Sequence, residues 1–186
     1  MKIFLIYIFL YLLPRVCIGE NIDFDKYNHQ TCSYLNNKLS IFKKNDAMFS
    51  SSYCIDDGEE IINNSILISG KKYELRDFKK TEIISRRINL EAISIYKVNK
   101  NYPLLIILFS EEFCCYPQLD GKNYRIYLYK IYRDKKNNEF KFISSDYILG
   151  ENVSGFDGIS DKRMIFRLRN IEEIKKYLKM GAILDN

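Results

Sequence analysis

A run of short apolar segments separated by polar turns dominates the middle of the chain. Between positions 65 and 149 these segments read SILISG, KKYELRDF, LEAISIYKV, YPLLIILFS, KNYRIYLYKIYRD and EFKFISSDYIL. The alternation of apolar and polar residues within the segments, and the turn residues between them, predict β-strands. Because the connections are too short for helical crossovers, consecutive strands are expected to pair antiparallel, as a β-meander of five to seven strands.

The residues before this region show a helical pattern instead. Apolar residues between Tyr27 and Phe42 recur at intervals near three and four, which predicts a helix over 23–45. The following stretch, DAMFSSSYCIDDGEE (46–60), is rich in serine and acidic residues. We expect it to form a loop with a short extended piece around Cys54.

The end of the chain predicts a loop, a strand and a helix. GENVSGFDGISDKR (150–163) contains three glycines and is expected to be a loop, and MIFRLR (164–169) a last strand. Asn170 can cap a closing helix, with Glu173 at the capping-box position and Gly181 as its end. The predicted fold is therefore α+β: an antiparallel β-meander sheet packed by an N-terminal and a C-terminal helix.

The first residues, MKIFLIYIFLYLLPRVCIGE, have the pattern of a secretory signal peptide. A lysine precedes an apolar run that is too short to span a bilayer, and small residues precede a cleavage site after Gly19. We therefore expect a signal peptide at 1–19 and a single domain at 20–186, located in the periplasm or secreted. An uncleaved N-terminal anchor and lipidation at Cys17 are the alternatives. No later segment has spanning length, so no stable membrane insertion is expected after cleavage.

The charge of the chain is too small and too scattered to favour nucleic acid. The formal net charge of +5 falls to +3 without the leader, since 27 basic residues then face 24 acidic ones. Proteins that bind nucleic acid usually concentrate basic residues on one face, which the sequence does not show. No nucleic-acid partner is expected.

Four cysteines remain after removal of the leader: Cys32, Cys54, Cys114 and Cys115. An even number in an exported chain predicts disulfide bonds. Adjacent residues of a strand point to opposite faces, so we expect Cys114 and Cys115 to form separate bridges, one to each of the other two. The alternative connectivity joins Cys32 to Cys54 and closes a vicinal ring.

Catalytic and cofactor motifs are not apparent. His29 is the single histidine, and the sequence contains no nucleophile elbow, phosphate loop or dinucleotide turn. We expect no cofactor, no metal and no enzymatic activity. The alternative is a hydrolase that uses carboxylates, with Glu111, Glu112 and Asp120 near the cysteine pair as its candidates.

Tyrosine is the remaining signal. In KNYRIYLYKIYRD, Tyr127 and Tyr129 are expected to share one face of a strand and Tyr124 to lie on the other, with Arg125 between them. Tyrosine and arginine are enriched at the centres of protein interfaces, so we predict Tyr124, Arg125, Tyr127 and Tyr129 as a binding surface for a protein partner. The alternative is that the N-terminal and C-terminal helices cover one face of this strand and a bent sheet covers the other.

These features together suggest an exported, non-enzymatic binding protein. Its most specific form would be an inhibitor or immunity-type protein that masks a secreted or delivered enzyme. The rival functions are the carboxylate-dependent hydrolase and a small-ligand carrier, which would hold its ligand in an apolar cavity between sheet and helix.

Overall fold

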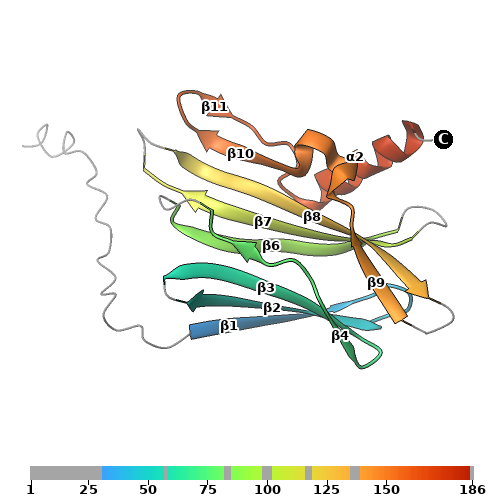
Figure 1. Cartoon of the computed structure of the whole chain (residues 1–186). Coiled ribbons are helices and arrows are strands. Elements are labelled where there is room, and N and C mark those ends of the chain that lie inside the picture. Colours follow the sequence, from blue (N-terminus) through green and yellow to red (C-terminus); the bar gives the residue numbers. More distant parts are fainter. Residues whose placement is uncertain are drawn as a thin grey trace, which may run out of the picture.

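The computed structural model describes residues 31–56, 58–81, 85–97, 102–115, 119–134 and 139–184. These residues form mostly antiparallel β-sheet, with a short 3-10 helix and one α-helix (Figure 1). The predicted signal peptide at 1–19 lies outside the described residues.

The first sheet has the strand order β1-β2-β3-β4, and β5 also pairs with β3. Its strands are β1 (Thr31–Leu39), β2 (Ala47–Asp56), β3 (Glu59–Ile68), β4 (Lys71–Glu74) and β5 (Phe78–Lys79). In the gaps around β5, the N–H of Leu75 donates to the carbonyl of Asn64 and the N–H of Lys80 to that of Glu60. Residues 71–80 therefore follow one edge of β3, whereas β1 is the terminal strand on the other side.

The second sheet has the order β11-β10-β8-β7-β6, and β9 also pairs with β8. Its strands are β6 (Arg87–Tyr96), β7 (Leu104–Phe113), β8 (Asp120–Asp134), β9 (Glu139–Ser144), β10 (Ser154–Ile159) and β11 (Arg163–Met164). The 3-10 helix η2 (Asp146–Val153) lies between β9 and β10, and helix α2 (Ile171–Leu184) ends the described chain.

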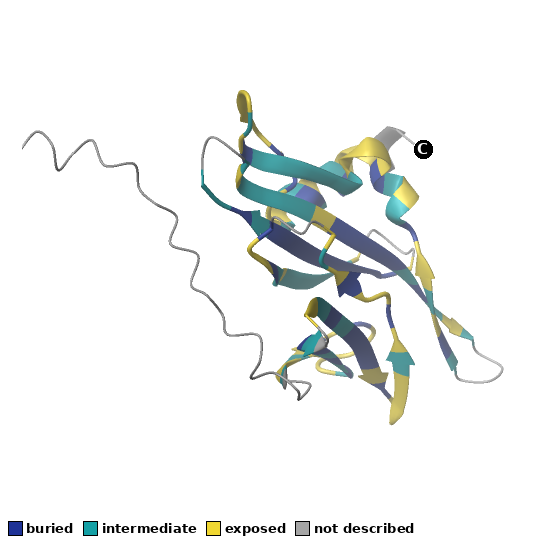
Figure 2. Ribbon diagram, turned by 60° about the vertical axis from the view of Figure 1, so that its left-hand side comes forward, coloured by how far each residue is buried: buried dark blue, intermediate teal, exposed yellow. Residues whose placement is uncertain are grey.

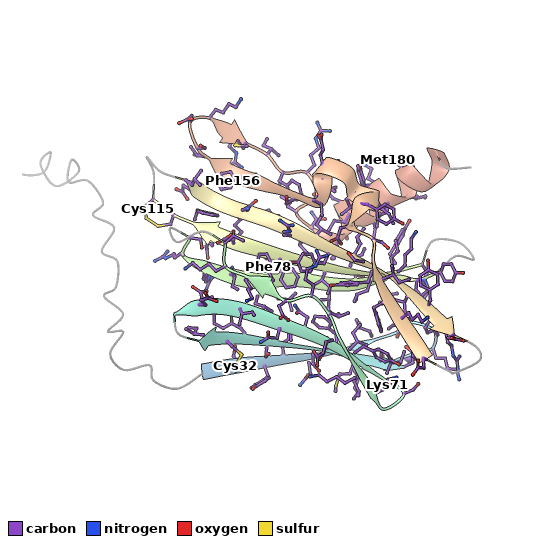
Figure 3. The ribbon with its side chains drawn as sticks, in the orientation of Figure 1. Cys32, Lys71, Phe78, Cys115, Phe156 and Met180 are labelled. Carbon is purple, nitrogen blue, oxygen red and sulfur yellow. A yellow bond between two sulfur atoms is a disulfide. The ribbon has the colours of Figure 1, made fainter. Side chains whose placement is uncertain are left out.

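The larger core lies between the two sheets. Phe78 of the first sheet stacks on Phe109 of β7 with ring centroids 4.7 Å apart, and both rings are buried (Figure 3). Offset aromatic stacking adds about 1 kcal/mol to the gain from burying apolar area. Around this pair lie further apolar side chains, including Leu39, Phe49, Ile62, Ile66, Ile88, Leu105, Ile107 and Ile131.

A second core lies on the opposite face of the second sheet. Ile174 and Leu178 of α2 and Leu149 of η2 are buried there, and Phe166 and Leu168 join them from the segment before α2. Asn170 caps α2, since its side-chain oxygen accepts a 2.9 Å hydrogen bond from the N–H of Glu173. The helix continues to Leu184 and so passes Gly181, where the sequence predicted its end.

Strand β7 is buried on both faces because it belongs to both cores (Figure 2). Alternate residues point to opposite sides of a strand, so its apolar run divides into two sets. Leu105, Ile107 and Phe109 face the first sheet, and Leu104, Ile106 and Leu108 face the second core. The unbroken apolar sequence at 104–109 is the consequence, since a strand with one solvated face would alternate.

The predicted N-terminal helix is wrong where the structure describes it. Residues 31–39 form β1, which pairs with β2 in a continuous antiparallel register, and the turn up to Asp46 follows. The helical spacing of Cys32, Leu35 and Leu39 therefore does not decide the conformation. The ladder with β2 supplies backbone partners and buries Leu39, so tertiary context overrides the local pattern. Residues 23–30 of the predicted helix lie outside the described part.

Two predicted loops also contain strands. Most of 46–60 belongs to β2 and β3, and β10 lies within 150–163. In the segment 150–163, glycine allows neighbouring groups to pack closely against the backbone and does not mark a turn. A Cβ atom on Gly155 would lie 2.3 Å from the ring of Phe166, and one on Gly121 of β8 would lie 2.3 Å from the backbone oxygen of Asp157. These glycines let β8, β10 and Phe166 pack closely.

The double burial of β7 predicts a large effect of truncating one of its residues. Ile106→Ala should lower the free energy of unfolding by about 3 kcal/mol, because it leaves a cavity under α2. The measurement is urea denaturation followed by far-UV circular dichroism. The control is Leu67→Ala on the exposed face of β3, where Leu67 is 37% exposed and a loss below about 1 kcal/mol is expected. Equal losses would contradict the assignment of Ile106 to a core.

Candidate functional site

Two of the predicted binding residues, Tyr127 and Tyr129, are buried between the sheets at 6% exposure. The hydroxyl of Tyr127 donates to the carbonyl of Asp77 at 3.3 Å, and the Tyr129 hydroxyl accepts from the N–H of Arg76 at 3.0 Å. The Arg76 guanidinium also lies 4.9 Å from the centre of the Tyr127 ring. Both tyrosines fix the segment between β4 and β5, so neither presents a surface to a partner.

The other two predicted residues lie elsewhere. Tyr124 is half-buried on the opposite face of β8, where it stacks on Phe166 with centroids 5.9 Å apart. Arg125 is exposed. The prediction of one exposed surface made of Tyr124, Arg125, Tyr127 and Tyr129 is therefore wrong in composition. Its assignment of the tyrosines to two faces is correct, but residues 31–79 form a sheet that covers one of them.

The four cysteines lie at disulfide distance, in a pairing different from the favoured one. Cys32 and Cys54 are directly opposite each other in the β1–β2 ladder, with sulfurs 2.13 Å apart. Cys114 and Cys115, just after β7, pair with each other at 2.05 Å (Figure 3). The expected bridges between the N-terminal segment and this loop are not formed. The expectation assumed that both cysteines continue a strand, whereas Cys115 has a φ of 85° and has left it.

The carboxylates of the rival hydrolase do not converge. Glu111 is 1% exposed and accepts hydrogen bonds from the N–H (3.1 Å) and hydroxyl (2.5 Å) of Thr81. Glu112 points to the other face of β7 and pairs with Arg87 at 2.8 Å. Asp120 is exposed at the start of β8. Within the described ranges, no group of three or more histidine, cysteine, aspartate and glutamate side chains is placed to hold a metal.

Exposed tyrosines gather on the far end of the second sheet, at residues outside the predicted binding set. The surface is formed by Tyr102, Lys130, Tyr132, Ile143 and Tyr147, which we call the tyrosine patch. Tyr102 and Tyr132 have ring centroids 3.9 Å apart, and Ile143 lies beside Lys130 in the β8–β9 ladder. Tyr102, Ile143 and Tyr147 are 53%, 49% and 71% exposed. Large apolar groups are thus contiguous and open to solvent here.

Lysines give the tyrosine patch its charge. The ammonium of Lys130 donates to the Tyr147 hydroxyl at 3.0 Å and lies 5.5 Å from the ring centre. This hydrogen bond raises the pKa of Lys130 above its ordinary value. Lys141 is exposed opposite Tyr132 in the same ladder. The patch therefore combines an apolar centre with positive charge.

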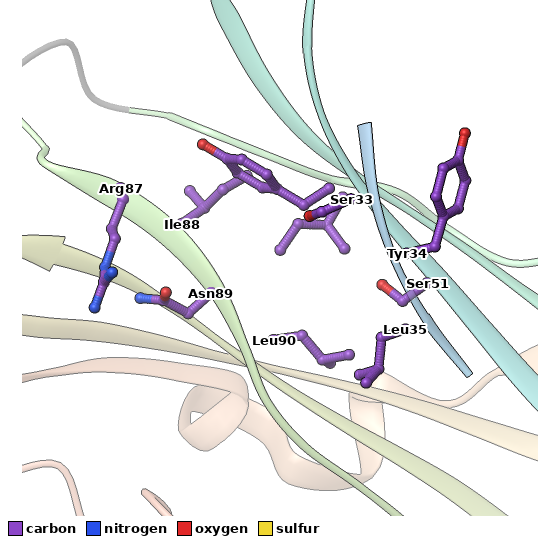
Figure 4. A pocket seen from close by; sticks show the side chains of 10 residues that line it. Ser33, Tyr34, Leu35, Ser51, Arg87, Ile88, Asn89 and Leu90 are labelled. Atoms are coloured by element: carbon purple, nitrogen blue, oxygen red, sulfur yellow. The ribbon is translucent and has the colours of Figure 1, made fainter. Parts of the chain in front are cut away.

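A second surface feature is a groove of about 430 Å³ between β1 and β6, which we call the β1–β6 groove (Figure 4). Its lining comes from β1, β2, β3 and β6 and is made of Ser33, Tyr34, Leu35, Ser51, Tyr53, Ile62, Arg87, Ile88, Asn89 and Leu90. Leu35 remains 47% exposed although it lies on the same face of β1 as the buried Leu39. The groove therefore marks a part of the first sheet that the second sheet leaves uncovered.

A partly buried carboxylate contacts two of the residues that line the groove. Glu60 accepts hydrogen bonds from the Tyr53 hydroxyl at 2.8 Å and from the N–H of Ile88 at 3.3 Å, and it pairs with Lys80 at 3.0 Å. Burial and the hydrogen bond to Glu60 raise the pKa of Tyr53 far above its usual value. These contacts join β3 to the start of β6 beside the groove.

The buried tyrosines predict a loss of stability in alkali. Burial raises the pKa values of Tyr127 and Tyr129 above the value of about 10 for an unfolded chain. Their contribution is therefore complete below pH ~10 and is lost as the pH rises through the folded-state values. Urea denaturation at a series of alkaline pH values should show a falling free energy of unfolding. Tyr127→Phe should flatten that fall and Tyr34→Phe should leave it unchanged; equal slopes in all three proteins would refute the cause.

The cysteine pairing predicts a specific peptide map. Proteolysis of the unreduced protein should give one peptide pair joined through Cys32 and Cys54. The peptide that contains Cys114 and Cys115 should run alone and be lighter by two hydrogen atoms than after reduction. Mass spectrometry distinguishes this result from the other two connectivities, either of which would link Cys114 to the N-terminal segment.

Comparison with known proteins does not assign this chain to a family. No family model matches the chain, and no curated protein or solved structure resembles it at a significant level. In the part of the chain that the structure describes, neither helix has the length and apolar character needed to cross a bilayer.

Proposed function

We propose that this chain is an exported, non-enzymatic binding protein that recognises a protein partner through the tyrosine patch. The observation that carries the proposal is the exposure of Tyr102, Ile143 and Tyr147 side by side with Lys130. Contiguous exposed apolar groups are unusual on soluble proteins and mark interaction sites. Tyrosine is also among the residue types that contribute most to interface energy.

The charge of the patch indicates the chemistry of the partner. Lys130 and Lys141 flank the aromatic rings, and charged groups at the rim of an interface steer encounter and fix register. The partner would present an apolar centre and carboxylates at its rim. A secreted or delivered enzyme with an acidic approach to its active site meets this description, so we propose an inhibitor or immunity-type role.

The cysteine pairs agree with an exported protein, and the contacts inside the fold give no support to the two rival functions. Two cysteine pairs at bonding distance are compatible with an oxidising, periplasmic or extracellular compartment. Glu111 and Glu112 have separate structural partners on opposite faces of β7, which gives no support to a shared carboxylate site. The space between the second sheet and α2 is occupied by the side chains of the second core, where a ligand carrier would need a cavity.

Affinity capture with matched variants tests the proposal. The oxidised mature protein would be immobilised as wild type, as the double variant Tyr102→Ser/Tyr147→Ser and as Ile165→Ser, which alters an exposed apolar residue outside both the tyrosine patch and the β1–β6 groove. A stoichiometric protein partner should bind the wild type and Ile165→Ser alike. The double variant should bind it at least about tenfold more weakly in titration calorimetry, since hot-spot truncations cost about 2 kcal/mol. A partner whose affinity is unchanged in the double variant would place the interface elsewhere, and the absence of any partner would refute the binding function.

A further inference from the structure

The β1–β6 groove is a gap in the sandwich rather than a simple surface hollow. β6 is the terminal strand of the second sheet and lies beside β3, whereas the first sheet continues to β2 and β1. The inner face of β1 at Ser33 and Leu35 therefore has no described strand above it, and Leu35 is half exposed. One additional strand beside β6 would cover this face and complete the sandwich.

The backbone of β6 determines what kind of group fits beside it. A terminal strand has a row of N–H and C=O groups along its outer edge that do not pair within the sheet. A second extended backbone can form hydrogen bonds with successive groups of this row. The N–H of Ile88 already bonds to Glu60, and the ladder with β7 shifts register between Leu90 and Ala92. The regular edge beside the groove is therefore limited to residues 88–90, and an added strand would pair with β6 there over a short length.

The side chains of the groove specify the sequence of such a strand. Leu35, Ile62 and Leu90 provide apolar contacts for an inward-facing side chain, and Ser51 and Tyr53 lie on the floor. Arg87 is the one charged residue among those that line the groove, and it remains well exposed although it pairs with Glu112. A carboxylate near the start of β6 would complement it.

We propose that the β1–β6 groove binds an extended segment of a partner protein, which adds to the edge of β6 as a short antiparallel or parallel strand. The segment carries at least one apolar side chain directed to Leu35 and Leu90 and an acidic residue placed against Arg87. Main-chain hydrogen bonds supply affinity and the alternate side chains supply specificity, as in other strand-addition complexes. This site is separate from the tyrosine patch, so either can fail without the other.

Selection from a library of displayed random peptides tests the groove directly. The bait is the oxidised mature chain, and the selected peptides are then synthesised and titrated against wild type and variants by fluorescence polarisation. Leu35→Glu should weaken binding at least about tenfold. Leu67→Glu, the same change on the outer face of β3, should leave it within about twofold. Arg87→Ala should weaken the peptides that contain a carboxylate and spare its amide analogues.

Amide methylation separates strand addition from simple side-chain insertion. N-methyl groups placed one at a time along a selected peptide should abolish binding at alternate positions, because one edge of a strand pairs with β6. Uniform tolerance, or failure to select any peptide that is sensitive to Leu35→Glu, would overturn the proposal. Self-association that Leu35→Glu abolishes would instead assign the groove to a second copy, and occupation by the N-terminal residues of the same chain, seen by cross-linking, would also overturn it.

Discussion

The burial of β7 on both faces is the constraint on which the rest of the molecule depends. Its six central apolar residues alternate between two cores, so the same strand supports the first sheet on one side and α2 on the other. Interiors are packed densely enough that a change in one residue is felt by its neighbours. The packing of the first sheet and the packing of α2 therefore depend on each other through β7 and the adjoining β8, although the first sheet and α2 come from separate parts of the chain.

Polar groups inside this arrangement serve to position segments. Glu111 holds Thr81, Glu60 joins Tyr53 to the start of β6, and the hydroxyl of Tyr129 holds the N–H of Arg76. In each of these three contacts the polar groups are paired, which avoids the cost of leaving a buried donor or acceptor without a partner. These contacts fix the chain between β3 and β6, where it crosses from one sheet to the other. Two of the residues that Glu60 contacts, Tyr53 and Ile88, line the β1–β6 groove.

Both candidate binding surfaces arise where the covering layers end. At the far end of the second sheet, Tyr102, Ile143 and Tyr147 of the tyrosine patch lie outside the second core and are left exposed. At the opposite edge of the sandwich, β6 ends the second sheet before it covers β1, and Leu35 is left half exposed. Each surface thus follows from the unequal extent of the layers rather than from a local motif.

The sequence by itself determined strands β6, β7, β8 and β9 of the second sheet, the alternation of Tyr124 and Tyr127 between two faces, and the closing helix with its Asn170 cap. These features depend on period-two patterning, short polar turns and local capping, all of which can be recognised within one segment. Only the tertiary structure decided that residues 31–39 are a strand, that Tyr127 and Tyr129 are buried, and that Cys114 bonds to Cys115. These outcomes depend on which distant segment lies opposite, because backbone pairing and burial between sheets outweigh the local preferences of a short stretch of chain.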